Sequence, residues 1–178
     1  MPNYRRSRVP GGTYFFTVTL LDRSSKLLVT HVDALRECVT AVRVARPFHI
    51  DAWVVLPDHM HAVWTLPPGD DDYSSRWTAI KKAFTKTVPK SEYISPARAA
   101  KGERGIWQRR FWEHTIRNEH DYAAHVDYVH INPLKHGLVT RVADWPYSSF
   151  HRWLGRGDYP QDWAGSADVE ISAGERKG

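Results

Sequence analysis

The pattern of apolar and polar residues predicts an α+β chain. Four short runs rich in aromatic and β-branched residues are typical of strands: Tyr14–Leu20, His49–Leu56, His59–Leu66 and Phe111–Ile116. Apolar residues at helical spacing predict three helices: Asp33–Arg46, a segment containing Trp77, Ile80, Phe84 and Val88, and Asn118–Pro133. The order strand, helix, strand, strand, helix, strand is the ferredoxin-like βαββαβ arrangement, in which the helices cover one face of the sheet.

Local signals set the expected boundaries of these elements. The dipeptide Pro57-Asp58 separates two strand-like runs and predicts a β-hairpin. A serine after the acidic loop is placed to begin the second helix, and a proline, Pro133, is expected to end the third. Residues 89–106 are expected to form a loose basic loop. We expect one catalytic, DNA-binding domain over residues 1–154, followed by an extended or mobile tail over residues 155–178.

Composition narrows the class of protein. The 178 residues suffice for one domain with a sizeable core. No apolar run approaches the roughly 18 residues that span a bilayer, and the first residues lack the apolar core of a signal peptide. The single cysteine, Cys38, excludes an internal disulfide and a cysteine-built zinc site, and its helical position suggests core packing. We therefore expect a cytoplasmic protein with no membrane partner.

The positive charge is concentrated in two segments. The formal net charge is +5, but residues 76–110 hold ten Lys and Arg residues against two acids, Glu92 and Glu103. Residues 1–20 add three arginines and no acid. A basic stretch of this kind favours a polyanionic partner, because neutralising phosphates releases counterions. The alternative is a solvated loop and helix face, and charge alone does not decide between them.

A pair of histidines lies on the third predicted strand. Residues i and i+2 of a strand project from the same face, so His59 and His61 would point the same way. Two imidazoles so placed can bind one metal ion, although a His-x-His pair is more often incidental. Asp58 beside them is either a turn residue or an outer-shell partner of the metal site. The three acids Asp70–Asp72 could form a second metal site, but a solvated loop that precedes a helix is the simpler interpretation.

The third predicted helix contains a tyrosine that could react. Tyr122, Val126 and Val129 form its apolar stripe, and Tyr128 falls about a third of a turn away at 100° per residue. Tyr128 would share its side of the helix with His125 and Asn132. This placement, off the core face and beside polar groups, suggests a nucleophile, whereas an unreactive half-buried tyrosine is the ordinary alternative.

Two motifs, LPDHMHAVWTLP and HVDYVHINPLKHGLV, resemble those of the REP-associated tyrosine transposases, relatives of the single-tyrosine HUH transposases. The likeness extends over nearly the whole chain, through MPNYRRSRVPGGTYFFTV, RPFHIDAWVVLPDHMH, SSRWTAIKKAF, IWQRRFWEHTIRN and WPYSSFHRW. Met60 satisfies the family's preference for a hydrophobic residue between the two histidines. The resemblance implies a ferredoxin-like catalytic domain that acts as a monomer on palindromic hairpin DNA with a short tetranucleotide beside the stem.

The resemblance also implies the roles of individual residues. The family's nucleophile falls on Tyr128, its paired histidines on His59 and His61, and the polar ligand four residues after the tyrosine on Asn132. Two imidazoles make Mn²⁺ at least as plausible as Mg²⁺, which prefers oxygen ligands. The product would be a 5′-phosphotyrosine and a free 3′-hydroxyl. Because that bond preserves the phosphodiester energy, no nucleotide cofactor is expected, and the chain has no glycine-rich phosphate loop of the P-loop type.

Single-stranded or hairpin DNA would contact the basic segments. The residues expected to bind it are Tyr4, Arg5, Arg6, Lys81, Lys82, Lys86, Trp107, Arg109 and Arg110. Core packing is an equally good interpretation of Trp107 and Trp112. Two other functions stay open: a hairpin-binding protein that no longer cuts, and a hydrolase in which water attacks and Tyr128 is incidental.

Overall fold

The computed structural model describes residues 5–165 and 171–175. Its strands are β1 (Thr13–Thr19), β2 (His49–Val55), β3 (His59–Thr65) and β4 (Trp112–Thr115). Its helices are α1 (Leu27–Thr30), α2 (Val32–Ala45), α3 (Tyr73–Thr87), α4 (Pro96–Ala99), α5 (Glu119–Lys135), the 3₁₀ helix η1 (Val142–Asp144) and α6 (Phe150–Gly155). The four strands and three long helices match the predicted elements to within a few residues. The short helix α4 lies inside the predicted basic loop.

The strands form one sheet in the order β2-β3-β1-β4. Each neighbouring pair is antiparallel. This is the strand order that a ferredoxin-like βαββαβ chain produces, so the predicted fold class is confirmed. The hairpin between β2 and β3 is also confirmed, since the Leu56 N–H donates to the His59 carbonyl across it at 2.9 Å.

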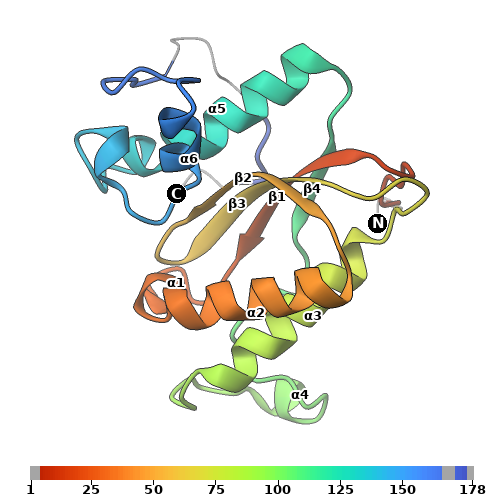
Figure 1. The fold of residues 1–178 in the computed structure, drawn as a ribbon. Helices are drawn as coiled ribbons and strands as arrows, with labels where there is room; N and C mark the ends of the chain where they lie inside the picture. Colours follow the sequence, from red (N-terminus) through yellow and green to blue (C-terminus); the bar gives the residue numbers. More distant parts are fainter. Residues whose placement is uncertain (1–4, 166–170, 176–178) are drawn as a thin grey trace.

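Helices cover both faces of the sheet (Figure 1). The two crossover helices, α2 and α3, pack on one face, as the βαββαβ pattern requires, around the stacked rings of Trp64 and Trp77 at 4.2 Å. The additional helix α5 packs on the opposite face, where Val126 and Val129 meet Phe15. The sheet therefore separates a layer formed by α2 and α3 from a layer formed by α5.

Strand alternation assigns each side chain to one of these layers. Along β3, Met60 and Trp64 belong to the α2–α3 core, whereas His59 and His61 face the α5 side. The Cα partner of His61 on β1 is Thr17, which points to the same side. Both predicted metal ligands of β3 consequently lie under α5.

The start of α3 differs from the expected one. Asp72, not a serine, caps the helix by accepting a hydrogen bond from the Ser75 N–H at 3.0 Å. Asp70 pairs with Arg76 at 2.7 Å, and Arg76 is buried there instead of joining the basic helix face. The three acids of this loop thus serve helix capping and ion pairing, and a metal site on them is not supported.

Helix α5 begins where expected and ends later. Asn118 caps it by accepting from the Asp121 N–H at 2.9 Å. The prediction that Pro133 ends the helix is wrong, because α5 continues to Lys135 and is closed by Gly137 at φ 68°. A proline removes one hydrogen bond and clashes with the preceding turn, but surrounding packing can hold the helix through it. Because α5 continues past Pro133, Lys135 lies in its last turn and His136 follows as its C-cap residue.

The remaining expectations concern the core and the tail. Cys38 is buried in the α2–α3 core, as predicted. Within the described ranges, no helix has both the length and the apolar character needed to cross a membrane. Beyond α6, Trp163 stacks on Phe150 at 5.8 Å, and Ile171 and Ala173 pack into the α5 layer.

A carboxylate fixes α5 to the edge strand β4. Asp121 lies in the first turn of α5 and accepts from His114 of β4 at 2.8 Å and from the Arg117 N–H at 2.9 Å. Its second oxygen lies 3.1 Å from His125 Nδ1, and the two imidazoles stack at 4.5 Å. Burial alone would raise the pKa of Asp121, but these hydrogen bonds outweigh it and lower the pKa to about 2.

Replacing this carboxylate should reduce stability in a pH-dependent way. We expect Asp121→Asn to lower the free energy of unfolding by about 2 kcal/mol at pH 7, because the hydrogen bonds to a buried charge are removed. A carboxyl whose pKa is lowered on folding stabilises the protein above its unfolded value, near 3.9, and loses that contribution as the pH falls toward about 2. The difference from wild type in urea unfolding should therefore shrink below pH 4. Asp33→Asn, an exposed carboxylate on α2, is the control, and an equal loss in both variants would contradict the assignment.

Candidate active site

The two histidines of β3 lie together beneath α5. Their ring centroids are 5.0 Å apart, and both side chains are almost fully buried. The His61 ring lies 5.3 Å from the ring of Tyr128 on α5. Two strand residues and one helix residue that are distant in sequence therefore converge, as the sequence predicts.

A second layer of contacts fixes which nitrogen each imidazole presents. Asp58 Oδ1 lies 2.8 Å from His59 Nδ1, which makes Asp58 an outer partner as well as a turn residue. Thr17 Oγ1 lies 2.8 Å from His61 Nδ1, and its hydroxyl donates a hydrogen bond to the Ala173 carbonyl. Both Nδ1 atoms are thereby assigned as N–H donors. The Nε2 atoms of both rings face the centre of the site.

Burial and charge set the protonation of these groups. Burial alone would raise the pKa of Asp58, but hydrogen bonds from His59 and Arg23 lower it to about 2. Burial lowers the pKa of His61 to about 4, so its imidazole is neutral near pH 7. Burial also acts to lower the pKa of His59, but the two carboxylates beside that ring outweigh it and raise the pKa. A neutral imidazole is the form that binds metal ions.

Tyr128 is buried, contrary to the expectation that it lies off the core face. Only 2% of the residue is exposed, and its ring packs edge-on against Phe15 at 5.9 Å. Tyr122, which periodicity assigned to the core, is partly buried, and its hydroxyl donates to Asp51 at 2.8 Å. The helical wheel misplaced Tyr128 because the sheet face under α5 is itself polar near the histidines. The core side of the helix and the reactive side therefore coincide.

A lysine from the last turn of α5 reaches the tyrosine hydroxyl. Lys135 Nζ donates to Tyr128 Oη at 3.0 Å and lies 4.5 Å from the ring centroid. Burial raises the pKa of the Tyr128 hydroxyl above its ordinary value of 10, and the negative charge of Glu175 acts in the same direction. Formation of a phenolate here requires compensating positive charge, and the Lys135 ammonium is placed to supply part of it.

Two buried polar atoms in the site make no hydrogen bond. Asn132 donates through Nδ2 to the Tyr128 carbonyl at 2.8 Å, whereas its Oδ1 has no partner, and His59 Nε2 is also without one. Buried polar atoms are ordinarily satisfied, so both of these atoms are available to a ligand. Imidazole nitrogen and amide oxygen are suitable donors for a divalent ion. The residues that the resemblance assigns to a metal, His59, His61 and Asn132, therefore fit one.

The C-terminal segment contributes a carboxylate that the sequence analysis did not identify. Glu175 Oε1 lies 2.7 Å from His61 Nε2 and 3.5 Å from the Nε2 atoms of both His59 and His136. Its other oxygen lies 3.6 Å from Lys135 Nζ. Burial acts to raise the pKa of Glu175, but the surrounding histidines, His136 first and then His59 and His61, outweigh it and hold the pKa far below its usual range. The carboxylate oxygen thus lies at the point toward which the Nε2 atoms of the three histidines converge.

Three residues at this site were missed, and two of them left a signal. Lys135 and His136 follow Tyr128 by seven and eight positions, a spacing that returns to its side of a helix. The expected helix end at Pro133 removed them from consideration. Glu175 left no local signal, because it lies 47 positions after the tyrosine and within no predicted element.

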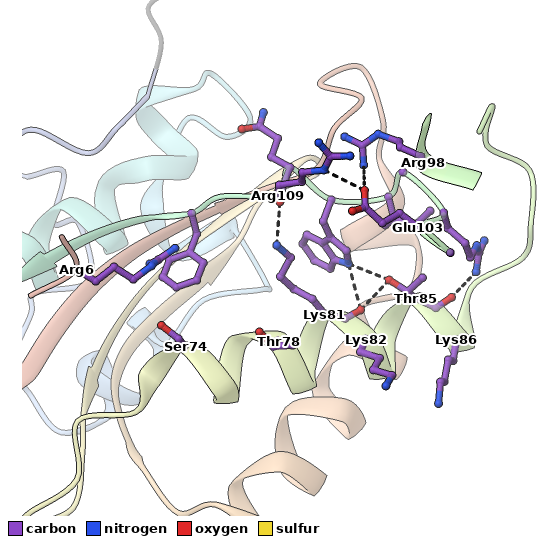
Figure 2. Close-up of a pocket in the computed structure, with 17 residues that line it drawn as sticks. Arg6, Ser74, Thr78, Lys81, Lys82, Thr85, Lys86, Arg98, Glu103 and Arg109 are labelled. Atoms are coloured by element: carbon purple, nitrogen blue, oxygen red, sulfur yellow. Dashed lines mark hydrogen bonds and ion pairs between the residues drawn. The ribbon is translucent and has the colours of Figure 1, made fainter. Parts of the chain in front are cut away.

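A cavity of about 760 Å³ opens between α3 and the segment that leads into β4 (Figure 2). It lies on the α2–α3 side of the sheet, away from Tyr128. Arg6 spans its inner end, with its guanidinium 3.9 Å from the ring centroid of Phe111 and 3.0 Å from Glu113 Oε2. Lys81 donates to the Gln108 carbonyl at 2.8 Å. Burial, assisted by the nearby Arg6 charge, lowers the pKa of Lys81 to about 8.

The cations lining this cavity fall into two groups. Arg98 and Arg109 both pair with Glu103, and Arg104 pairs with Glu92, so these arginines hold the loop in place. The second group consists of α3 lysines that form no ion pair with an acid in the part of the chain that the structure describes: Lys81, Lys82 and Lys86. The lysine group is the one available to an incoming anion.

Not all of the other predicted DNA-binding residues line the cavity. Arg5 and Arg110 are exposed and do not line it, and Tyr4 lies outside the described residues. Trp107 is only 8% exposed, and its indole N–H donates to the Lys81 carbonyl at 3.2 Å and to the Thr85 hydroxyl at 3.1 Å. The packing interpretation of Trp107 therefore fits, and its ring forms part of the wall with little surface left for a stacked base.

The chain is similar to proteins of known family. It is 55% identical over 176 residues to the REP-associated tyrosine transposase of Escherichia coli (strain K12), covering 99% of this chain and 98% of that protein. A relative from Haemophilus influenzae, described as belonging to the same family, is 45% identical over 172 residues and covers 96% of this chain and 98% of its own length. No protein-family model matches the chain.

A solved structure supports the same assignment. The structure of a REP-associated tyrosine transposase bound to a REP hairpin superposes with a TM-score of 0.85 at 54% identity and covers 99% of both chains. Sequence identity and fold therefore agree over the full length. This chain belongs to the REP-associated tyrosine transposases, a family of enzymes that act on DNA.

Proposed function

We propose that this protein cleaves and rejoins single-stranded DNA beside a REP hairpin, with Tyr128 as the nucleophile and a divalent ion, Mg²⁺ or Mn²⁺, held by His59, His61 and Asn132. The observation that carries the proposal is the convergence of the Tyr128 ring and the His61 ring at 5.3 Å within a buried polar site. The REP-hairpin complex of the 54% identical relative supports the substrate class.

The chemistry follows from the groups around the phenol. Tyr128 Oη loses its proton to water and forms a bond to phosphorus, the bond from phosphorus to the 3′ oxygen breaks, and that oxygen takes up a proton from water. The Lys135 ammonium, 3.0 Å from Oη, stabilises the negative charge that this oxygen carries as nucleophile and, in the rejoining step, as leaving group. A bound divalent ion would withdraw charge from the phosphate and orient it for in-line attack. The phosphotyrosine retains the phosphodiester energy, so rejoining needs no nucleotide.

The DNA strand would approach over the basic surface. The α3 lysines offer unpaired positive charge at the cavity, and the exposed Arg5 and Arg110 extend this charge beyond it. Contacts of this kind neutralise phosphates without reading their sequence. We propose that the enzyme acts as a monomer on chromosomal repeats in the cytoplasm.

Removing the Tyr128 hydroxyl should abolish covalent chemistry and leave DNA binding intact. We expect Tyr128→Phe to form no protein–DNA adduct on denaturing gels with a hairpin oligonucleotide that carries a single-stranded flank, because no other hydroxyl occupies this position. Tyr122→Phe, which loses a hydroxyl bonded to Asp51 on the same helix, is the matched control and should still form the adduct.

Three results of this experiment distinguish the alternatives. An adduct that persists in Tyr128→Phe at the wild-type rate would refute the nucleophile assignment. Cleavage without an adduct, giving 5′-phosphate ends, would identify a hydrolase in which water attacks. Tight binding with neither cleavage nor adduct in the wild type would identify a hairpin-binding protein without catalysis.

Removing the metal should stop cleavage without releasing the hairpin. We expect EDTA to eliminate adduct formation and added Mn²⁺ or Mg²⁺ to restore it, because the proposed mechanism needs a divalent charge on the phosphate. His61→Asn should prevent this restoration. Hairpin affinity, measured by fluorescence anisotropy, should change little in either case. Full adduct formation in EDTA would contradict the metal requirement.

Neutralising the α3 lysines should weaken hairpin binding and make it less dependent on salt concentration. We expect the double variant Lys82→Gln and Lys86→Gln to lower hairpin affinity and to reduce the slope of log K against log salt concentration by about 1 for each DNA phosphate that a lysine no longer neutralises. The charge-matched control is the double variant Lys90→Gln and Lys101→Gln, which changes two exposed lysines that do not line the cavity. An unchanged salt slope in the double variant would place the DNA elsewhere.

A further inference from the structure

Three imidazoles, not two, surround one point in the active site. The Nε2 atoms of His61, His59 and His136 lie 2.7, 3.5 and 3.5 Å from a single oxygen, Oε1 of Glu175. The rings of His59 and His136 meet edge to face at 5.0 Å. One ligand atom from each of His59, His136 and Glu175 lies within 4.8 Å of the other two, the spacing of donors that can share one ion.

The contacts of His136 suggest that its imidazole binds a ligand instead of stabilising the fold. His136 is the C-cap residue of α5, but its backbone N–H performs the capping by donating to the Asn132 carbonyl at 2.9 Å. Within residues 5–165 and 171–175, the only polar partner of its side chain is the Glu175 carboxylate. The imidazole thus has no role in the fold beyond its position beside His59, and it lies four residues after Asn132, whose Oδ1 is unpartnered.

We propose that His136 is a further metal ligand, which joins His59, His61 and Asn132 around the point now filled by Glu175 Oε1. The inference rests on the metal site of the proposed function and adds to it a residue outside the paired histidines. Imidazole binds a divalent ion at about 2.0–2.2 Å, so an ion at this point requires a shift of about 0.6 Å by the His61 nitrogen and of about 1.4 Å by those of His59 and His136. Three nitrogen donors and one amide oxygen form a set suited to a first-row transition ion.

The experiment measures metal affinity directly, without DNA and without turnover. The full-length protein is titrated with Mn²⁺, and free Mn²⁺ is quantified by electron paramagnetic resonance. We expect His136→Asn to weaken binding at least about 10-fold, because even outer partners of metal-bound histidines contribute 10- to 100-fold. His120→Asn, an exposed histidine on the same helix, should bind as wild type does. Thermal melts of the metal-free proteins check that His136→Asn folds normally.

A second background separates direct ligation from an effect that passes through Glu175. The same pair is compared with Glu175→Gln present, which removes the carboxylate charge that contacts His136. A loss of at least 10-fold on His136→Asn in both backgrounds supports the proposal. A loss seen only when Glu175 is intact overturns it, because the imidazole would then act by holding the carboxylate. Equal affinity of His136→Asn and wild type also overturns it.

Spectroscopy and a further variant complete the test. Pulsed electron paramagnetic resonance of bound Mn²⁺ should show fewer directly coupled imidazole nitrogens in His136→Asn than in wild type, and an unchanged nitrogen signal would contradict direct ligation. His59→Asn distinguishes the two levels of inference. If His59→Asn leaves Mn²⁺ affinity unchanged, the metal site of the proposed function fails as a whole. If His59→Asn weakens binding and His136→Asn does not, only the third imidazole is excluded.

Discussion

The ring of Phe15 holds the reactive groups in one place. It belongs to β1, is fully buried, and contacts His61 at 5.6 Å, His125 at 4.9 Å and Tyr128 at 5.9 Å. One aromatic side chain of the central strand β1 thus packs against His61 of β3 and Tyr128 of α5. Because packed interiors transmit small displacements, the spacing between nucleophile and imidazole depends on this apolar contact.

The sheet face under α5 also contains buried polar groups, and their burial lowers the stability of the fold. Burying imidazoles, an amide and a phenol costs free energy unless each is hydrogen bonded. Thr17 and Asp58 satisfy the inner nitrogens of the two histidines, and the Tyr128 carbonyl satisfies the Asn132 amide. His59 Nε2 and Asn132 Oδ1 are left without a hydrogen bond, and a bound ligand would satisfy them.

The fold and part of the site could be predicted because they depend on local patterns. Period-two alternation places His59 and His61 on one face, and the order of elements gives the ferredoxin-like sheet. The orientation of Tyr128 could not be obtained this way, since a helical wheel separates apolar from polar residues and this helix packs on a polar part of the sheet. The length of α5 depends on tertiary support for the turn after Pro133. The place of Glu175 depends on a long-range contact that no local pattern encodes.

Gly174 and Trp112 show how closely the C-terminal segment packs against the edge strand β4. Gly174 adopts φ 68° and lies so near Trp112 that an added Cβ would fall 2.6 Å from the indole. The carbonyl of Ala173, the residue before it, accepts a hydrogen bond from the Thr17 hydroxyl. The carboxylate of Glu175, the residue after it, lies among the three histidines. Trp112 belongs to β4, the edge strand that separates the basic cavity from the tyrosine face. In the proposed function the DNA contacts both the lysines of the cavity and Tyr128, and β4, with the C-terminal segment packed against it through Gly174, lies between these two groups.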